Sequence, residues 1–178
     1  MKRILLDTNV YGKIVEEQSF LMDLSHLVPV EFVIYGMPLI RKELRDLSSK
    51  VTLEGHSKRN MVLIAYDKFI KKENHSLKTN EFILLLAHKY FESYKKIGGA
   101  FSHDEMLSDF TIVACATLYQ LDVVVSDDKR TMLSDKARQA YELINKEKQF
   151  RTPEFYLYEK FKEIIRGLSN VRSANSSE

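Results

Sequence analysis

Cysteine is almost absent from the sequence, which has one residue, Cys115, in a chain of 178. No internal disulfide can form, so the chain is not a disulfide-stapled scaffold, and we expect a cytoplasmic location. Cys115 lies in the apolar run FTIVACATL, which predicts a buried and unreactive thiol.

Long apolar runs and an excess of one charge are also missing. No segment approaches the ~18 apolar residues that a membrane span needs, so we expect no membrane partner. Asp7 interrupts the first apolar stretch too early for the hydrophobic region of a signal peptide. The 27 basic residues nearly balance the 25 acidic ones, so bulk charge alone does not indicate nucleic-acid binding.

Short apolar segments alternate with longer amphipathic ones along the whole chain. This alternation predicts an α/β fold, a three-layer α/β/α sandwich with a mainly parallel central sheet. We predict strands over residues 2–7, 29–35, 122–126 and 150–152. We predict helices over residues 9–24, 38–47, 56–73, 80–97, 102–120, 135–147 and 153–166, with a short one from about Lys129.

The chain shows no repeat, low-complexity linker or other sign of a domain boundary. We therefore expect a single domain over residues 1–168. The two helices within 56–97 are predicted to form a helical hairpin inserted in that domain, and the polar tail 169–178 is predicted to be disordered.

Acidic residues recur where the predicted strands end. Asp7 follows the first strand, Glu43 lies on the helix after the second, and Asp127 and Asp128 follow the third. Asp109 lies early in the helix that leads into the third strand. In a parallel sheet the carboxyl ends of the strands lie at one edge, where ligands bind, so these acids are expected to gather there.

Clustered carboxylates repel one another, and a cation relieves that repulsion. Oxygen ligands suit Mg²⁺ or Mn²⁺, and no Cys or His lies in the set to favour zinc. A pair of such ions can clamp a phosphodiester and activate a bound water.

Each acid also has an ordinary structural interpretation. Asp7 is a preferred residue for capping the next helix. Glu43 can pair with a basic neighbour on an exposed helix face. Asp127 and Asp128 can be turn residues. Taken singly these interpretations compete well, but the ordered set favours a metal site.

Four segments, in this order, resemble the PIN domain, the nuclease fold of VapC-like toxins and related RNA-processing enzymes. They are LLDTN, IRKELRDL, DFTIVACATL and VVVSDDK, which begin at residues 5, 40, 109 and 123. The resemblance implies an endoribonuclease that hydrolyses RNA with a water activated by Mg²⁺ or Mn²⁺. Toxin-type members also imply an antitoxin-like partner and a homodimer.

The resemblance assigns catalytic and metal-binding roles to Asp7, Glu43 and Asp109. The fourth acid usually lies in T-x-D, and the chain has S-x-D instead. The fourth position is therefore open between Asp128, which we prefer, and Asp127.

Other residues near these acids are predicted to support them. Asn9 and Ser126 are expected to orient carboxylates or a water. Lys129 and Arg130 are the predicted phosphate contacts. Single-stranded or looped RNA is the expected substrate, because attack on a phosphodiester needs an accessible backbone.

Three other functions compete with a nuclease. The first is a catalytically inactive PIN-like module that binds RNA or a protein partner. A receiver-like domain needs adjacent acids after its first strand, where this chain has only Asp7. A haloacid-dehalogenase-like phosphatase needs D-x-D, and Asn9 occupies its second acidic position.

Overall fold

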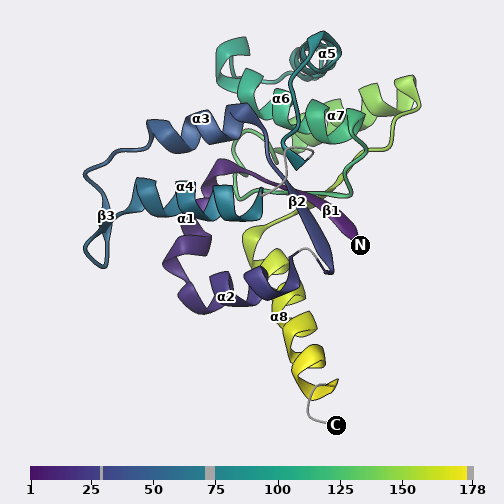
Figure 1. The fold of residues 1–178 in the computed structure, drawn as a ribbon. Coiled ribbons are helices and arrows are strands. Elements are labelled where there is room, and N and C mark those ends of the chain that lie inside the picture. Colours follow the sequence, from purple (N-terminus) through teal and green to yellow (C-terminus); the bar gives the residue numbers. More distant parts are fainter. Residues whose placement is uncertain (29, 71–74, 176–178) are drawn as a thin grey trace.

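A parallel sheet with strand order β2–β1–β5–β6 forms the centre of the computed structural model, which describes residues 1–28, 30–70 and 75–175 (Figure 1). The strands are β1 (Lys2–Leu6), β2 (Phe32–Tyr35), β5 (Val123–Val125) and β6 (Glu154–Tyr156). Every neighbouring pair in this sheet is parallel. The two central strands, β1 and β5, are mostly apolar, as expected for strands that helices cover on both faces.

Two groups of helices cover the sheet (Figure 1). The first is built from α1 (Thr8–Glu16), α2 (Gln18–Leu27), α3 (Pro38–Asp46), α4 (Lys58–Phe69) and α8 (Tyr158–Asn175). The second is built from α5 (Glu81–Lys96), α6 (His103–Leu118) and α7 (Asp135–Lys148). The predicted α/β/α architecture with a mainly parallel sheet is confirmed.

A small antiparallel hairpin joins α3 to α4 and projects from the body of the molecule (Figure 1). Its strands are β3 (Thr52–Leu53) and β4 (His56–Ser57). Glu54 and Gly55 turn the chain between them with positive φ angles of 50° and 82°. This hairpin is not predicted from the sequence.

The two helices predicted to form a hairpin within 56–97 lie in different layers. In the described part of the chain α4 packs on α1 and α3, whereas α5 packs on α6 and α7. The prediction of paired helices is therefore wrong, because each helix has its apolar face against a different neighbour. The end of the first predicted helix, at residues 71–73, lies outside the described residues.

Several predicted boundaries also differ from the structure. The helix predicted over 9–24 is two helices, because the chain bends at Glu17. The last strand lies at 154–156, where it pairs with β5, so Pro153 precedes a strand and does not begin a helix. The segment after Lys129 is a turn. The predicted disordered tail is helical as far as Asn175, and 176–178 lie outside the described residues.

Two other predictions concern single segments. The strand predicted from 29 begins at Phe32, and residue 29 itself is not described. Cys115 is buried inside α6, and burial raises the pKa of its thiol to about 12, which confirms the prediction of an unreactive cysteine. None of the described helices is long and apolar enough to cross a membrane.

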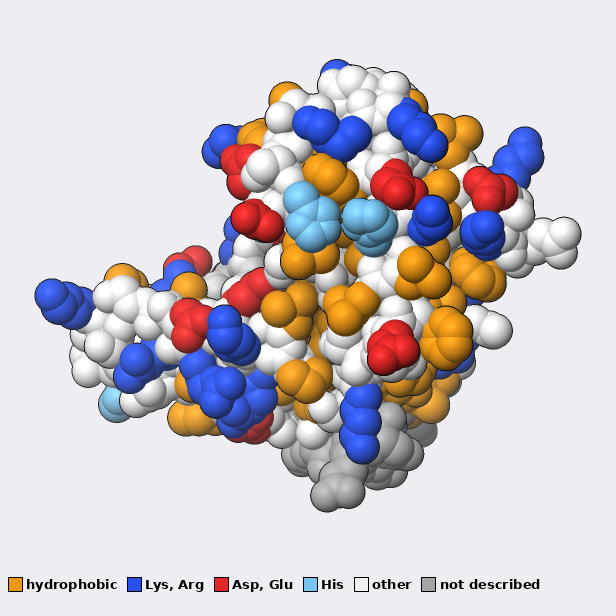
Figure 2. Space-filling model, turned by 90° about the horizontal axis from the view of Figure 1, so that it is seen from above, with side chains coloured by type: hydrophobic (Ala, Val, Ile, Leu, Met, Phe, Trp, Pro, Cys, Tyr) orange, Lys and Arg blue, Asp and Glu red, His pale blue; other side chains and the backbone are white. Residues whose placement is uncertain are grey.

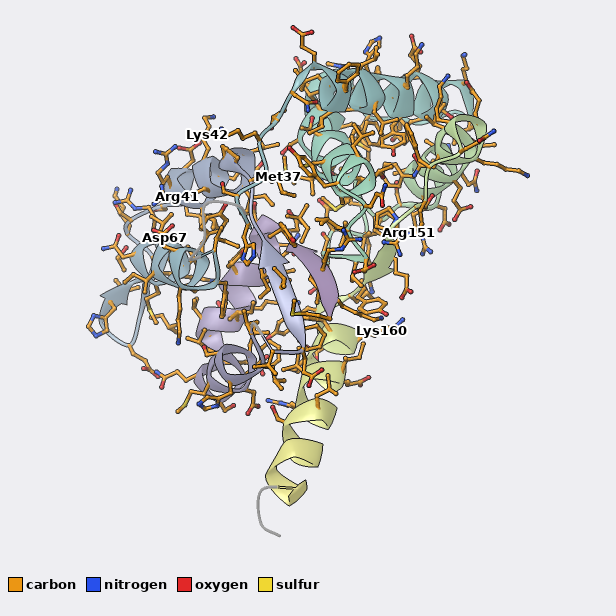
Figure 3. All side chains as sticks on the ribbon, turned by 45° about the vertical axis from the view of Figure 1, so that its right-hand side comes forward. Met37, Arg41, Lys42, Asp67, Arg151 and Lys160 are labelled. Carbon is orange, nitrogen blue, oxygen red and sulfur yellow. The ribbon has the colours of Figure 1, made fainter. Side chains whose placement is uncertain are left out.

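Two side-chain contacts join α4 to α3 and to the residue that precedes α3. Arg41 donates to both carboxylate oxygens of Asp67 at 3.0 and 2.9 Å, and Figure 3 shows the two side chains facing each other across the helices. The Tyr66 hydroxyl donates to the buried Met37 carbonyl oxygen at 3.1 Å. These contacts set the position of α4 against the helix that carries Glu43.

Gly36, at the end of β2, makes room for Tyr66. A Cβ atom at this position would lie 2.6 Å from Cζ of the Tyr66 ring and nearer still to its hydroxyl oxygen. We expect Gly36→Ala to lower the free energy of unfolding by about 2 kcal/mol or more, because the ring must move and its hydrogen bond to Met37 is disturbed. Urea denaturation measures the change.

Gly167→Ala is the matched control for that substitution. Gly167 lies in α8, and a Cβ atom there meets nothing within 4 Å. We expect this variant to be as stable as the wild type or slightly more stable. Equal stability of the two alanine variants would show that Gly36 is not sterically required.

Candidate active site

Asp7 lies at the carboxyl end of β1 and is almost fully buried, with 5% of its surface exposed. One carboxylate oxygen accepts the Thr8 backbone N–H at 2.7 Å. The other accepts the Ser126 hydroxyl at 2.7 Å and the Asn9 side-chain amide. Asp7 therefore does cap α1, as its ordinary interpretation predicts, and it also has a fixed orientation at the sheet edge.

Ser126 and Asn9 connect Asp7 to the loop after β5. Ser126 is fully buried, and its hydroxyl oxygen accepts the Asp128 backbone N–H at 3.0 Å. The Asn9 side chain donates to Ser126 and accepts the Asp127 N–H at 3.1 Å. Both residues lie where the sequence predicts supporting groups.

Glu43 projects from α3 towards α1 and α6. The Thr8 hydroxyl donates to one of its carboxylate oxygens and the Ser108 hydroxyl to the other. Its neighbour Lys42 pairs with Asp46 instead, at 3.6 Å. The surface ion pair that would explain Glu43 without a site is therefore not formed with Lys42.

Asp127 and Asp128 point in different directions. Asp127 accepts hydrogen bonds from the Lys13 ammonium and the Tyr158 backbone N–H. Burial alone would raise the pKa of Asp127, but these two donors outweigh it and lower the pKa. Asp128 instead accepts the backbone N–H groups of Arg130 and Thr131, both at 2.9 Å.

A pocket of about 480 Å³ brings the acids together. Asp7, Glu43, Asp109 and Asp128 all line it, and Asp127 does not. The geometry thus places our preferred fourth acid in the pocket. The remaining lining residues are Thr8, Asn9, Gly12, Leu47, Ser48, Val51, Lys58 and Arg59.

Burial and mutual repulsion raise the pKa of two of these acids. Asp109 has a pKa of about 7, chiefly because of burial, with a hydrogen bond to Thr131 opposing the shift. Asp7 has a pKa of about 6, again chiefly because of burial, and Ser126 and Thr8 oppose the shift. The charges of the other pocket acids add to both shifts. A divalent cation would reverse these effects.

The oxygen ligands in the pocket suit a hard cation, but the side chains are not arranged closely enough to enclose one. Among the described residues, no three His, Cys, Asp or Glu side chains converge closely enough to hold a metal ion. The carboxylates are instead engaged by neighbouring hydroxyl groups, for example those of Thr8, Ser108 and Ser126. The residues fit Mg²⁺ or Mn²⁺ if the carboxylates turn from these donors towards the ion.

Three of the hydroxyl groups that donate to the acids, those of Thr8, Ser108 and Thr131, are not predicted from the sequence. Thr8 and Ser108 each directly adjoin a predicted metal ligand, so a search for hydroxyls beside the acids could have found them. Thr131 is near Asp128 in the chain and donates to its carboxylate at 2.6 Å.

The predicted phosphate contacts lie outside the acidic pocket. Lys129 lines a separate pocket that includes Arg138 and Phe155. The Arg130 guanidinium lies over the Phe101 ring at 4.9 Å. The basic residues that do line the acidic pocket are Lys58 and Arg59.

The raised pKa of Asp109 makes the stability of the metal-free protein depend on pH. The folded protein holds the proton more tightly than the unfolded chain, so its stability falls as pH rises from about 4 to about 7. We expect Asp109→Asn to raise the free energy of unfolding at pH 8 by roughly 1–3 kcal/mol, because it removes a buried charge. At pH 4 the variant and the wild type should differ little.

Urea denaturation in EDTA at both pH values measures this effect, with Asp104→Asn as the control. Asp104 lies on the same helix with its side chain fully exposed. Its replacement should leave stability unchanged or slightly lower it, because the residue is in the first helical turn. If Asp109→Asn is no more stable than the wild type at pH 8, the pocket does not carry the repulsion inferred for it.

Comparisons with known proteins identify the fold and not a close relative. No protein-family model matches the sequence, and no curated protein matches it. The FitAB structure bound to an IR36 DNA fragment is 17% identical, with a TM-score of 0.55 over 87% of this chain and 94% of that chain.

Two VapBC structures are similar to the same extent. VapBC2 from Rickettsia felis, bound to a DNA fragment from its promoter, is 13% identical, with a TM-score of 0.54 over 87% of this chain and 98% of that chain. VapBC-1 from nontypeable Haemophilus influenzae is 14% identical, with a TM-score of 0.52 over 88% and 98%. These neighbours are toxin–antitoxin complexes whose VapC component is a PIN-domain toxin. The chain therefore has a PIN-like fold.

Proposed function

We propose that this protein is an endoribonuclease of the PIN type that hydrolyses phosphodiester bonds of single-stranded or looped RNA and depends on Mg²⁺ or Mn²⁺. One observation carries the proposal: four carboxylates, from the residue after β1, from α3, from α6 and from the loop after β5, line one pocket. Such a set is costly in a metal-free fold and suits a cation-dependent reaction on a phosphate ester.

In this proposal Asp7, Glu43, Asp109 and Asp128 hold the ion. A bound Mg²⁺ or Mn²⁺ supplies Lewis-acid activation of a water and neutralises charge on the phosphate. The protein supplies orientation. Asp7, for example, is held in one orientation by Ser126 and Asn9.

Hydroxyl groups keep the pocket stable when it holds no ion. Thr8 and Ser108 satisfy both oxygens of Glu43, and Thr131 donates to Asp128. Each hydroxyl can rotate, so it can release a carboxylate oxygen without movement of the backbone. The same residues thus serve the folded metal-free protein and leave the acids available.

The structural neighbours extend the proposal to a biological role. They are toxin–antitoxin complexes, so we propose a toxin-type nuclease with an antitoxin-like protein partner. A homodimer stays a prediction of the family resemblance.

An inactive PIN-like module that binds RNA or a protein partner is the second candidate. Two observations favour it. The acids accept hydrogen bonds from neighbouring hydroxyl groups, and among the described residues no three His, Cys, Asp or Glu side chains lie close enough together to hold a metal ion. The two candidates differ in whether a metal ion acts at the pocket, which experiment can decide.

Cleavage of a labelled single-stranded RNA with Mn²⁺, Mg²⁺ or EDTA tests the proposal. We expect cleavage by the wild type with either metal, none in EDTA, and a loss on the order of 100-fold in Asp7→Asn and Asp109→Asn. Asp104→Asn should cleave like the wild type, because its side chain is fully exposed.

Equal cleavage by all four proteins would show that these acids are not the active site. If the folded wild type does not cleave RNA with either metal, and Mn²⁺ does not raise its melting temperature, the inactive module is the better description. A metal that stabilises the wild type and not Asp7→Asn supports the proposed ligands independently of activity.

A further inference from the structure

The pocket has a second chemical character beside its acids. Four of its lining residues are apolar or basic, and we call them the α4 wall: Leu47, Val51, Lys58 and Arg59. We propose that the α4 wall binds one phosphate of a single-stranded RNA and its neighbouring base, with Arg59 as the phosphate-binding residue. This inference rests on the proposed function and names how its substrate is held.

Arg59 is the strongest part of the evidence. It is half-buried in the first turn of α4 and lines the pocket, yet its guanidinium makes no ion pair or hydrogen bond with any residue that the structure describes. Other arginines do pair: Arg41 binds Asp67, and Arg151 binds Asp122. An unpaired guanidinium in a pocket is suited to bind a phosphate through two parallel hydrogen bonds.

Lys58 has a different role, although it is adjacent in the chain. Its ammonium pairs with Glu16 on α1, so much of its charge is already compensated. The side chain reaches Glu16 by passing Gly12, where an added Cβ atom would lie 3.6 Å from the Lys58 nitrogen. Lys58 therefore shapes the wall, and Arg59 is the cation left for a ligand.

The position of Arg59 relative to the acids is set by the packing of α4. The Arg41–Asp67 pair and the Tyr66–Met37 hydrogen bond fix α4 against α3, as Figure 3 shows for the labelled residues. Because Glu43 lies on α3, these contacts also fix Arg59 relative to one of the pocket acids. A phosphate bound by Arg59 would thus be held at a set place beside the acids.

Charge around the α4 wall favours a polyanion. Residues 38–59 contain six Lys and Arg residues, of which Arg41, Lys42 and Lys58 pair with acids. The side chains of Arg45, Lys50 and Arg59 form no ion pair with a described residue. Figure 2 shows basic side chains gathered over the lobe that α3 and the β3–β4 hairpin form. This basic surface lies next to the pocket and can follow the backbone of a strand that enters it.

The apolar part of the wall suits an unpaired base. Leu47 and Val51 are 38% and 50% exposed although both line the pocket. Exposed apolar surface of this kind can cover the face of a base or a ribose, which duplex RNA keeps stacked. An acidic protein segment fits this part of the wall less well, because its carboxylate side chains have no flat apolar face with which to cover Leu47 and Val51.

RNA binding in the Asp109→Asn background, where we expect cleavage to be about 100-fold slower, tests the inference. Fluorescence anisotropy of a labelled 12-nucleotide single-stranded RNA would compare Arg59→Gln and Arg59→Lys with Lys68→Gln. Lys68 is the matched control: it is exposed in the last turn of the same helix and does not line the pocket. Arg59→Gln and Lys68→Gln lower the net charge of the protein by the same amount.

We expect Arg59→Gln to weaken binding about 10-fold and to reduce the slope of log affinity against log salt concentration by about 0.7. The affinity of Arg59→Lys for RNA should lie between those of the parent protein and Arg59→Gln, because lysine keeps the charge and loses the paired hydrogen bonds. Lys68→Gln should bind like the parent protein.

Identical affinity and salt slope for Arg59→Gln and Lys68→Gln would overturn the inference and leave the nuclease proposal standing if the wild type cleaves RNA. Displacement of the RNA by a polyglutamate peptide at equal or lower concentration would also overturn it, in favour of an acidic protein ligand. Absence of both RNA binding and RNA cleavage by the wild type would overturn the inference together with the proposed function.

Discussion

The burial of a carboxylate at the end of the central strand is the constraint on which the site depends. Asp7 is nearly inaccessible to water, and a charge in that position must be hydrogen-bonded or neutralised. Thr8, Asn9 and Ser126 provide donors to its two oxygens. Ser126 in turn binds the backbone of Asp128, so the orientation of one acid is linked to the position of another.

The same constraint explains why the fold tolerates four acids in one pocket. Each of Asp7, Glu43 and Asp128 has hydroxyl or N–H donors, which lower the cost of its charge. Asp109 is the least well compensated, and its pKa is accordingly the higher of the two raised values. The proposed binding of a cation rests on this residual repulsion between the pocket acids.

The parts of the structure that could be predicted from the sequence depend on local patterns. Apolar runs at β1 and β5 identify buried strands. The helix predicted from residue 102 begins there in the structure, where Ser102 and Glu105 form a capping box. Acids after strand ends gather because parallel strands share one edge, which holds here for Asp7 and Asp128.

The parts that could not be predicted depend on residues far apart in the chain. The local S-x-D pattern favours Asp128 but does not exclude Asp127. In the structure Asp127 is instead bound by Lys13 and by the backbone N–H of Tyr158 at the start of α8. Pro153 has a good local signature for a helix start, but pairing of the next residues with β5 outweighs it. Arg59 reaches the pocket because α4 packs on α3, whereas Lys129, beside Asp128 in sequence, lines another pocket.

The central claim, that the four acids form one metal site, is tested most directly by locating Mn²⁺ through anomalous diffraction from crystals soaked in the metal. We expect manganese within about 2.0–2.3 Å of carboxylate oxygens from both Asp7 and Asp109. A well-ordered pocket without manganese, or manganese bound only at other acids, would contradict it.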